Sequence, residues 1–286
     1  AVFATLIGPG SGLWLLSLLL IAGGGAIGVV VAKRVQMTEM PELGKLNRRE
    51  AARLVEAFAA ANKQHMGADN DGDPVYLALE DDTRFLAIEM EADPGPRKGA
   101  AIILHGRGMH ADWSQVAAPL RTGLPGHGWS TLSLQMPVLA KDAKYYDYLP
   151  VFPAAVPRIE AGIRHLREQG VERIILVAHS CSVHMSMTWI EAVGDDSISA
   201  YVGIGMGATD YQQPMPAPFP LDRIEVPLLA LYGSDDYPAV HRQAMLLTSR
   251  LPDLHPASAV EQISKSKART IGLVLPLDQP QTPVAF

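Results

Sequence analysis

The chain has 286 residues, 48% of them hydrophobic, and a formal net charge of −6. This length suits one large α/β domain with a short accessory segment. Its charge comes without a basic stripe or a run of Lys and Arg, so we expect no nucleic acid among its partners. The single cysteine, Cys181, excludes an internal disulfide and a cysteine-based zinc or iron–sulfur site.

The amino-terminal stretch is strongly apolar. Residues 1–32 contain no charged side chain, and residues 13–32 are apolar apart from Ser17 and the glycines. About 20 such residues are enough to cross a bilayer as a helix. We therefore predict a transmembrane helix within residues 1–34 that anchors the protein to a membrane. Basic residues follow this span, which favours a cytoplasmic location for the rest but leaves the side of the membrane open.

Part of this stretch is similar to a known membrane protein. Residues 4–43, including the runs 23–28 and 35–43, resemble a membrane segment of the β subunit of proton-translocating NAD(P) transhydrogenase. Downstream, neither further spans nor a glycine-rich dinucleotide turn follows. We carry over no activity from this resemblance, and we interpret residues 44–48 as a junction between sequences of different origin.

The remaining chain divides into a linker over residues 35–74 and an α/β domain over residues 75–286. Within the linker, Leu54, Val55 and Phe58 share one face of a predicted amphipathic helix over 47–64. The domain alternates strand and helix patterns, which indicates a mainly parallel sheet with helices on both faces. Predicted strands cover 75–79, 84–89, 100–104, 130–134, 173–178, 200–205 and 227–232, and predicted helices cover 113–124, 153–169, 181–193 and 239–250.

A candidate nucleophile follows the fifth of these strands. The apolar run 173–178 leads directly into His179-Ser180-Cys181-Ser182 and a predicted helix. This order resembles the nucleophile turn of α/β-hydrolases, in which a strained backbone lifts a serine hydroxyl above the sheet between small flanking residues. Ala178 and Ser182 stand where glycines are usual. Serine is also a favoured helix N-cap, so the local pattern leaves both interpretations of Ser180 open.

Two further turns end at the same edge of the predicted sheet. The glycine-bearing turn His105-Gly106-Arg107-Gly108 predicts a backbone N–H donor near Arg107, which would form an oxyanion hole with the N–H of Cys181. The turn Gly233-Ser234-Asp235-Asp236 brings carboxylates to this edge. Asp236 is the better candidate for the acid of a catalytic triad, and Asp235 is the alternative.

These turns, together with several longer strings, resemble one protein family. The strings are 104–108, Asp112-Trp113, 119–121, 128–137, Tyr145-Tyr146, Tyr232-Gly233 with Asp236, and 238–240. They are similar to the bacterial DUF3530 group of α/β-hydrolase-like proteins over about residues 48–250. The resemblance implies the α/β-hydrolase fold, a serine hydrolase activity, and, with the apolar amino terminus, anchoring to a bacterial inner membrane.

The sequence departs from this family at its histidine. Family members carry the general base after their last strand, but here the candidate last strand, 268–275, leads into a tail without histidine. His255, in a turn-like Leu254-His255-Pro256, is our candidate base, while His241 is expected on the helix after the acid turn. Loss of one member of a triad costs about 10⁴ to 10⁶ in turnover.

The sequence thus supports two functional hypotheses. The first is a serine hydrolase that cleaves a carboxylic ester or thioester through an acyl-enzyme on Ser180, with no metal and no cofactor. Its small-molecule acyl substrate would contact Tyr145, Tyr146, Tyr148 and Phe152, unless these aromatic residues close the core instead. The second is a catalytically impaired, membrane-tethered binding scaffold.

Overall fold

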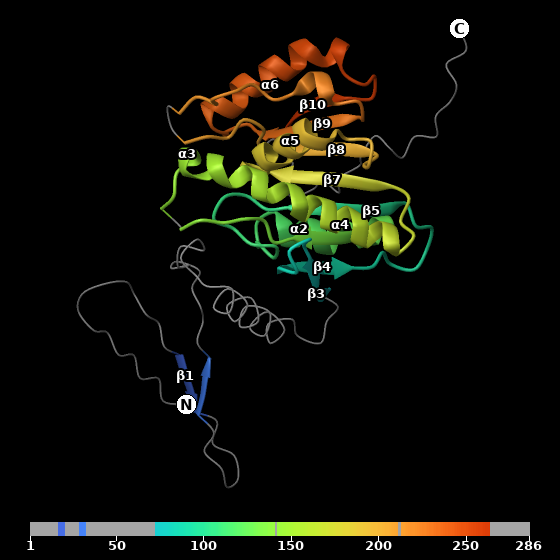
Figure 1. Cartoon of the computed structure of the whole chain (residues 1–286), viewed down its shortest axis with the longest axis vertical. Helices are drawn as coiled ribbons and strands as arrows, with labels where there is room; N and C mark the ends of the chain where they lie inside the picture. Colours follow the sequence, from blue (N-terminus) through green and yellow to red (C-terminus); the bar gives the residue numbers. More distant parts are fainter. Residues whose placement is uncertain (1–16, 21–28, 33–71, 141, 211–212, 264–286) are drawn as a thin grey trace, which may run out of the picture.

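The computed structural model describes residues 17–20, 29–32, 72–140, 142–210 and 213–263 (Figure 1). The linker helix predicted over 47–64 and the strand predicted over 268–275 lie outside these ranges. Residues 73–263 are organised by one eight-stranded sheet. Its strands are β3 (Asp73–Ala78), β4 (Arg84–Met90), β5 (Gly99–Leu104), β6 (Trp129–Leu134), β7 (Ile174–His179), β8 (Ala200–Ile204), β9 (Leu228–Gly233) and β10 (Ala259–Ile263).

The strands lie in the order β10-β9-β8-β7-β5-β6-β4-β3. From β6 to β10 all neighbours are parallel, whereas β4 and β3 add an antiparallel edge. The carboxyl ends of the parallel strands therefore meet at one edge of the sheet, where ligand sites of such folds form. Because β7 is central in this order, the turn that follows it is flanked by the turns after β5 and β8.

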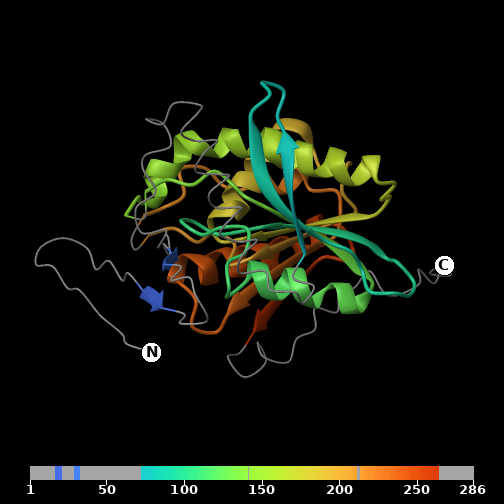
Figure 2. The same ribbon diagram turned by 90° about the horizontal axis from the view of Figure 1, so that it is seen from below.

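Helices cover both faces of the sheet (Figure 2). The layer formed by α4 (Val156–Glu168) and α5 (Cys181–Val193) lies on one face, and α2 (Ala117–Gly123) with α6 (Pro238–Arg250) lies on the other. Shorter elements are α3 (Tyr145–Tyr148) and the 3₁₀ turns η2 (Pro125–His127), η3 (Leu149–Ala155), η4 (Leu221–Arg223) and η5 (Leu251–Asp253). The predicted fold class is confirmed as an α/β fold with a mostly parallel sheet.

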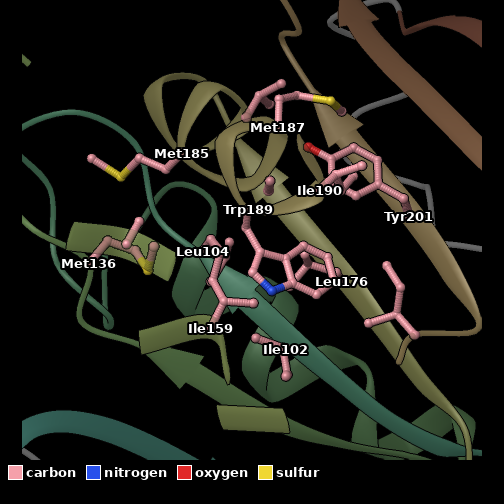
Figure 3. Packing of buried hydrophobic residues seen from close by; sticks show 14 of the residues in the cluster. Ile102, Leu104, Met136, Ile159, Leu176, Met185, Met187, Trp189, Ile190 and Tyr201 are labelled. Carbon is pink, nitrogen blue, oxygen red and sulfur yellow. The ribbon is translucent and has the colours of Figure 1, made fainter. Parts of the chain in front are cut away.

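Alternate residues of the central strands face opposite helix layers, as expected for a sheet buried on both sides. In β7, Ile175 and Val177 belong to the apolar cluster that includes Leu124, next to α2. Leu176 belongs to the larger cluster with residues of α4 and α5. Figure 3 shows Trp189 of α5 at the centre of that cluster, fully buried against Ile102 and Leu176. This packing fixes α5, and hence the turn before it, against the sheet.

The seven predicted strands lie within two residues of the observed ones, but three other elements differ. The helix predicted over 113–124 begins only at Ala117, as α2. The helix predicted over 153–169 begins as η3 and becomes α4 only at Val156. Pro150 and Pro153 explain this start, because proline lacks the N–H that an α-helix interior needs. The last described strand, β10, was not predicted from the sequence. Its central Glu261 and Gln262 are exposed at the edge of the sheet, so its apolar pattern is weak.

The amino-terminal stretch differs from the single helix that we predicted there. Ser17–Leu20 (β1) and Val29–Ala32 (β2) pair as antiparallel strands. The β-branched run of β2 favours a strand. Among the described residues, no helix is both long and apolar enough to span a bilayer. The rest of the predicted 1–34 span lies outside those residues, and the resemblance to the transhydrogenase stays untested.

Candidate active site

Ser180 occupies a strained turn between β7 and α5. Its backbone angles are φ 55° and ψ −115°, and the only other described non-glycine residue with positive φ is Asp82. Such conformations cost about 1–3 kcal/mol and persist only where the surroundings enforce them. The Ser180 N–H donates to the carbonyl of Ile204, 2.8 Å away. The Ser180 side chain makes no capping hydrogen bond to α5, so its position at the helix start is not that of an ordinary N-cap.

The residues that replace the usual glycines fit the turn. Ala178 is fully buried and lies opposite Leu104 on one neighbouring strand and Gly203 on the other. Ser182 is also buried, and its hydroxyl donates to the carbonyl of His105 in the turn after β5. The β-carbon at each position is therefore accommodated, and the Ser182 hydroxyl connects the Ser180 turn with the neighbouring loop.

His105 holds the backbone of that neighbouring loop. Its Nε2 accepts a hydrogen bond from the Met136 N–H at 2.9 Å, so the ring proton lies on Nδ1, which donates to the Gly106 carbonyl, also at 2.9 Å. Burial lowers the pKa of His105 to about 3, which keeps the ring neutral. The Gly106 carbonyl and the Arg107 N–H belong to the same trans peptide, which directs them to opposite sides. The Arg107 N–H therefore points away from His105. The first N–H groups of a helix also lack intrahelical partners, and Cys181 is the first residue of α5.

The turn after β9 contributes a carboxylate. Asp236 accepts hydrogen bonds from the N–H groups of Gly233, at 3.3 Å, and of its neighbour Tyr237, at 2.9 Å. These bonds hold the carboxylate over the carboxyl end of β9. Asp235, the alternative acid, is exposed and does not line the cavity described next.

One cavity of about 350 Å³ joins these turns at the carboxyl edge of the sheet. Four residues predicted from the sequence line it, namely Ser180, Cys181, Arg107 and Asp236. Tyr145 is also in its lining, whereas Tyr148 is fully buried and its hydroxyl accepts the Leu139 N–H. The cavity thus places a serine hydroxyl, the start of a helix and a carboxylate around a volume suited to a small molecule.

His179 is the one histidine that lines the cavity in the part of the chain that the structure describes. Its Nδ1 is buried and has no hydrogen-bond partner among those residues. Burial lowers the pKa of His179 to about 4, although the negative charge of Asp236 acts in the opposite direction. At neutral pH the ring is therefore uncharged and retains a lone pair that can accept a proton.

An ion pair bridges the rim of the cavity. The Arg107 guanidinium donates two hydrogen bonds to the carboxylate of Asp210, at 2.7 and 2.6 Å. The same carboxylate accepts the Tyr145 N–H at 2.5 Å. Hydrogen bonding to Arg107 lowers the pKa of Asp210, which is ionised at neutral pH. Asp210 thereby connects the loops that follow β5, β6 and β8.

Comparison with known proteins supports the fold. The sequence family described as "Protein of unknown function (DUF3530)" matches residues 54–148. This DUF3530 region includes Arg107 and Tyr145, and it ends before the Ser180 turn. No curated protein sequence matches the chain.

Solved structures resemble about two thirds of the chain. The esterase Pf2001 of Pyrococcus furiosus has a TM-score of 0.52 at 12% identity, with 71% of this chain and 89% of that one covered. Est1E from Butyrivibrio proteoclasticus has a TM-score of 0.50 at 14% identity, with 68% and 89% covered. At such identities the likeness shows the fold alone, which is that of an α/β-hydrolase.

His255 does not reach this cavity. It precedes β10, and its Nδ1 accepts the Ala257 N–H at 3.1 Å. Nearby, the Ser258 hydroxyl accepts the N–H of Leu228, the first residue of β9. Because β9 and β10 are parallel, His255 lies at the amino edge of the sheet, opposite Ser180. The candidate base from the sequence is therefore separated from the other candidates by the length of a strand.

The other histidines near the site have structural surroundings. His241 of α6 packs edge-on against Tyr232, with ring centroids 5.4 Å apart. His184 of α5 is buried, stacks on Phe152 and bonds through Nε2 to the Ala208 carbonyl at 2.9 Å. Neither lines the cavity. The sequence analysis identified neither Asp210 nor His179 as a site residue.

Proposed function

We propose that the cavity belongs to a serine hydrolase that cleaves a carboxylic ester or thioester through an acyl-enzyme on Ser180. The observation that carries the proposal is the strained Ser180 turn at the cavity wall. Helix capping does not explain this strain, since the Ser180 side chain makes no capping hydrogen bond to α5. In this fold such a turn exposes a nucleophile.

In the proposed reaction the Ser180 oxygen attacks the acyl carbon and its proton passes to His179. The negative charge that develops on the acyl oxygen is stabilised by the N–H groups of Cys181 and Arg107. The bond from the acyl carbon to the leaving alcohol or thiol breaks, and His179 gives its proton to that group. Water then attacks the acyl carbon of the acyl-enzyme and passes a proton to His179. The bond to the Ser180 oxygen breaks, the carboxylic acid leaves, and the proton returns from His179 to Ser180. Asp236 stabilises the protonated ring of His179, consistent with its raising effect on that pKa.

The low pKa of His179 has a kinetic consequence. A general base works best when its pKa lies near the working pH. His179, with a pKa of about 4, is therefore a weak base, and the proposed hydrolase is slow. Acidification below this value would protonate the ring and stop the first step.

The test is labelling of the full chain with a fluorophosphonate probe, followed by mass spectrometry, alongside hydrolysis of para-nitrophenyl butyrate. We expect a label on Ser180 and none in Ser180→Ala. The His179→Gln variant should lose about 10²-fold or more in hydrolysis rate, the contribution usual for a general base. The matched change His255→Gln should leave the rate unchanged.

A second function is favoured by one specific observation. His255 lies at the opposite edge of the sheet, and residues 264–286 contain no histidine. The alternative is a catalytically impaired binding scaffold, tethered by the apolar amino terminus. Absence of both labelling and hydrolysis would reject the hydrolase and leave the scaffold. Turnover of the ester by the unaltered chain would reject the scaffold.

A further inference from the structure

The charged side chains around the cavity have an acidic balance. Arg107, Asp210 and Asp236 line it, which gives one positive and two negative charges. His179 and Cys181 add no charge at neutral pH, because burial lowers the pKa of His179 to about 4 and raises that of Cys181 to about 12. Arg107 is thus the one cation in the described cavity lining. Whether the cavity can bind an anionic substrate therefore depends on whether the Arg107 guanidinium can pair with it.

Arg107 is already paired with a carboxylate of the protein itself. Its two terminal nitrogens donate in parallel to the two oxygens of Asp210, the geometry in which a guanidinium binds a carboxylate most strongly. The third hydrogen bond of Asp210, from the Tyr145 N–H, holds the carboxylate in place from a separate loop. The side chain of Asp210 is only 19% exposed, so water weakens the pair less than on an open surface. An acyl group that carries a carboxylate would have to displace Asp210.

We propose that Asp210 sets the charge specificity of the cavity, by occupying Arg107 so that uncharged acyl groups are accepted and carboxylate-bearing ones are rejected. This inference rests on the proposed hydrolase function, because it names the substrate class of that site. Rejection comes from two sources. One is repulsion by Asp210 and Asp236, and the other is that the described cavity lining holds no cation besides the paired Arg107.

Asp210→Asn is the substitution that isolates this role. The amide keeps an oxygen that can accept from Tyr145 or Arg107, but it carries no charge. Arg107 then becomes available to a carboxylate on the substrate. Asp253→Asn is the matched control, since it makes the same change in an Arg–Asp pair of similar length, Arg250–Asp253 at 2.7 Å, on the exposed end of α6.

The experiment compares two esters with five-carbon acyl groups, para-nitrophenyl pentanoate and mono-para-nitrophenyl glutarate. The unaltered chain should prefer the pentanoate. In Asp210→Asn the ratio of kcat/KM should shift about 10- to 100-fold toward the glutarate, the range for hydrogen bonds to a charged group. Asp253→Asn should not change the ratio. An unchanged ratio in a folded Asp210→Asn protein, judged by circular dichroism, would overturn the inference.

A binding measurement separates this inference from the proposed function. In a Ser180→Ala background, which cannot form an acyl-enzyme, Asp210→Asn should raise the affinity for free glutarate by the same factor in calorimetry. If the unaltered chain neither labels nor hydrolyses esters but this affinity rises, the hydrolase fails and the charge specificity stands. If esters are hydrolysed and neither ratio nor affinity responds, only the charge specificity fails. If Asp210→Asn does not fold, Arg107→Gln provides the test, because it keeps the backbone N–H of residue 107. This variant should shift the ratio of kcat/KM further toward the pentanoate. An unchanged ratio, or a shift toward the glutarate, would refute the inference.

Discussion

The strained backbone of Ser180 leads to a stability prediction that needs no substrate. At φ 55° and ψ −115° a residue with a β-carbon loses about 1–3 kcal/mol, which glycine avoids. Glycine in turn has about 0.5–1 kcal/mol more conformational entropy to lose on folding. The balance leaves Ser180→Gly about 1 kcal/mol more stable than Ser180→Ala, because alanine retains the β-carbon and hence the strain.

Urea unfolding followed by circular dichroism measures this difference, which also corresponds to about 2–4 °C in Tm for a domain of this size. The matched control is Met245, a 74% exposed residue in the middle of α6. There the order reverses, and Met245→Gly should be about 1 kcal/mol less stable than Met245→Ala. If Ser180→Gly is no more stable than Ser180→Ala, the turn is not strained and the argument for a nucleophile loses its main support.

Two further predictions concern buried polar groups. Burial lowers the pKa of His105 to about 3 and of His184 to about 4, so the unfolded chain binds more protons once the pH falls below their ordinary value of 6.5. The free energy of unfolding should then fall by up to about 1.4 kcal/mol per pH unit for each ring, and urea titrations of His184→Phe between pH 6.5 and 4 should show a slope smaller by one such contribution. Tyr201→Phe removes the hydrogen bond to Ser186, 2.7 Å long between fully buried groups, and should cost about 1 kcal/mol. The same change at the exposed Tyr237 should stay within about 0.5 kcal/mol, and equal losses at both positions would contradict this reasoning.

The positions of Ser180, Arg107 and Asp236 could be predicted because each follows directly on a strand with a clear apolar pattern. Parallel strands bring such turns to one edge whatever the distance between them in the sequence. Strand β10 has no such pattern, since its middle residues are polar and exposed. Because β10 was not predicted, nothing in the sequence indicated that His255 precedes a strand and lies at the opposite edge of the sheet.

The Arg107–Asp210 pair could not have been predicted from local patterns. The two residues are 103 positions apart, and Asp210 lies in an irregular loop where an aspartate is ordinarily a turn former. Only the packing of loops after three different strands brings the carboxylate to Arg107. The place of His179 in the cavity lining was not predictable for a related reason, because a histidine beside a serine carries no sequence signal for the direction of its side chain.

The hydroxyl of Ser182 matters for any design that would replace Ser182 by the glycine usual in this turn. Restoring the customary glycine would relax the backbone two residues after Ser180, and it would also cut the hydrogen bond that Ser182 donates to the His105 carbonyl. That carbonyl begins the loop whose peptide orientation His105 controls. Ser182 therefore differs from the usual glycine but contributes a hydrogen bond of its own. A design that restores glycine would have to replace both that hydrogen bond and the β-carbon.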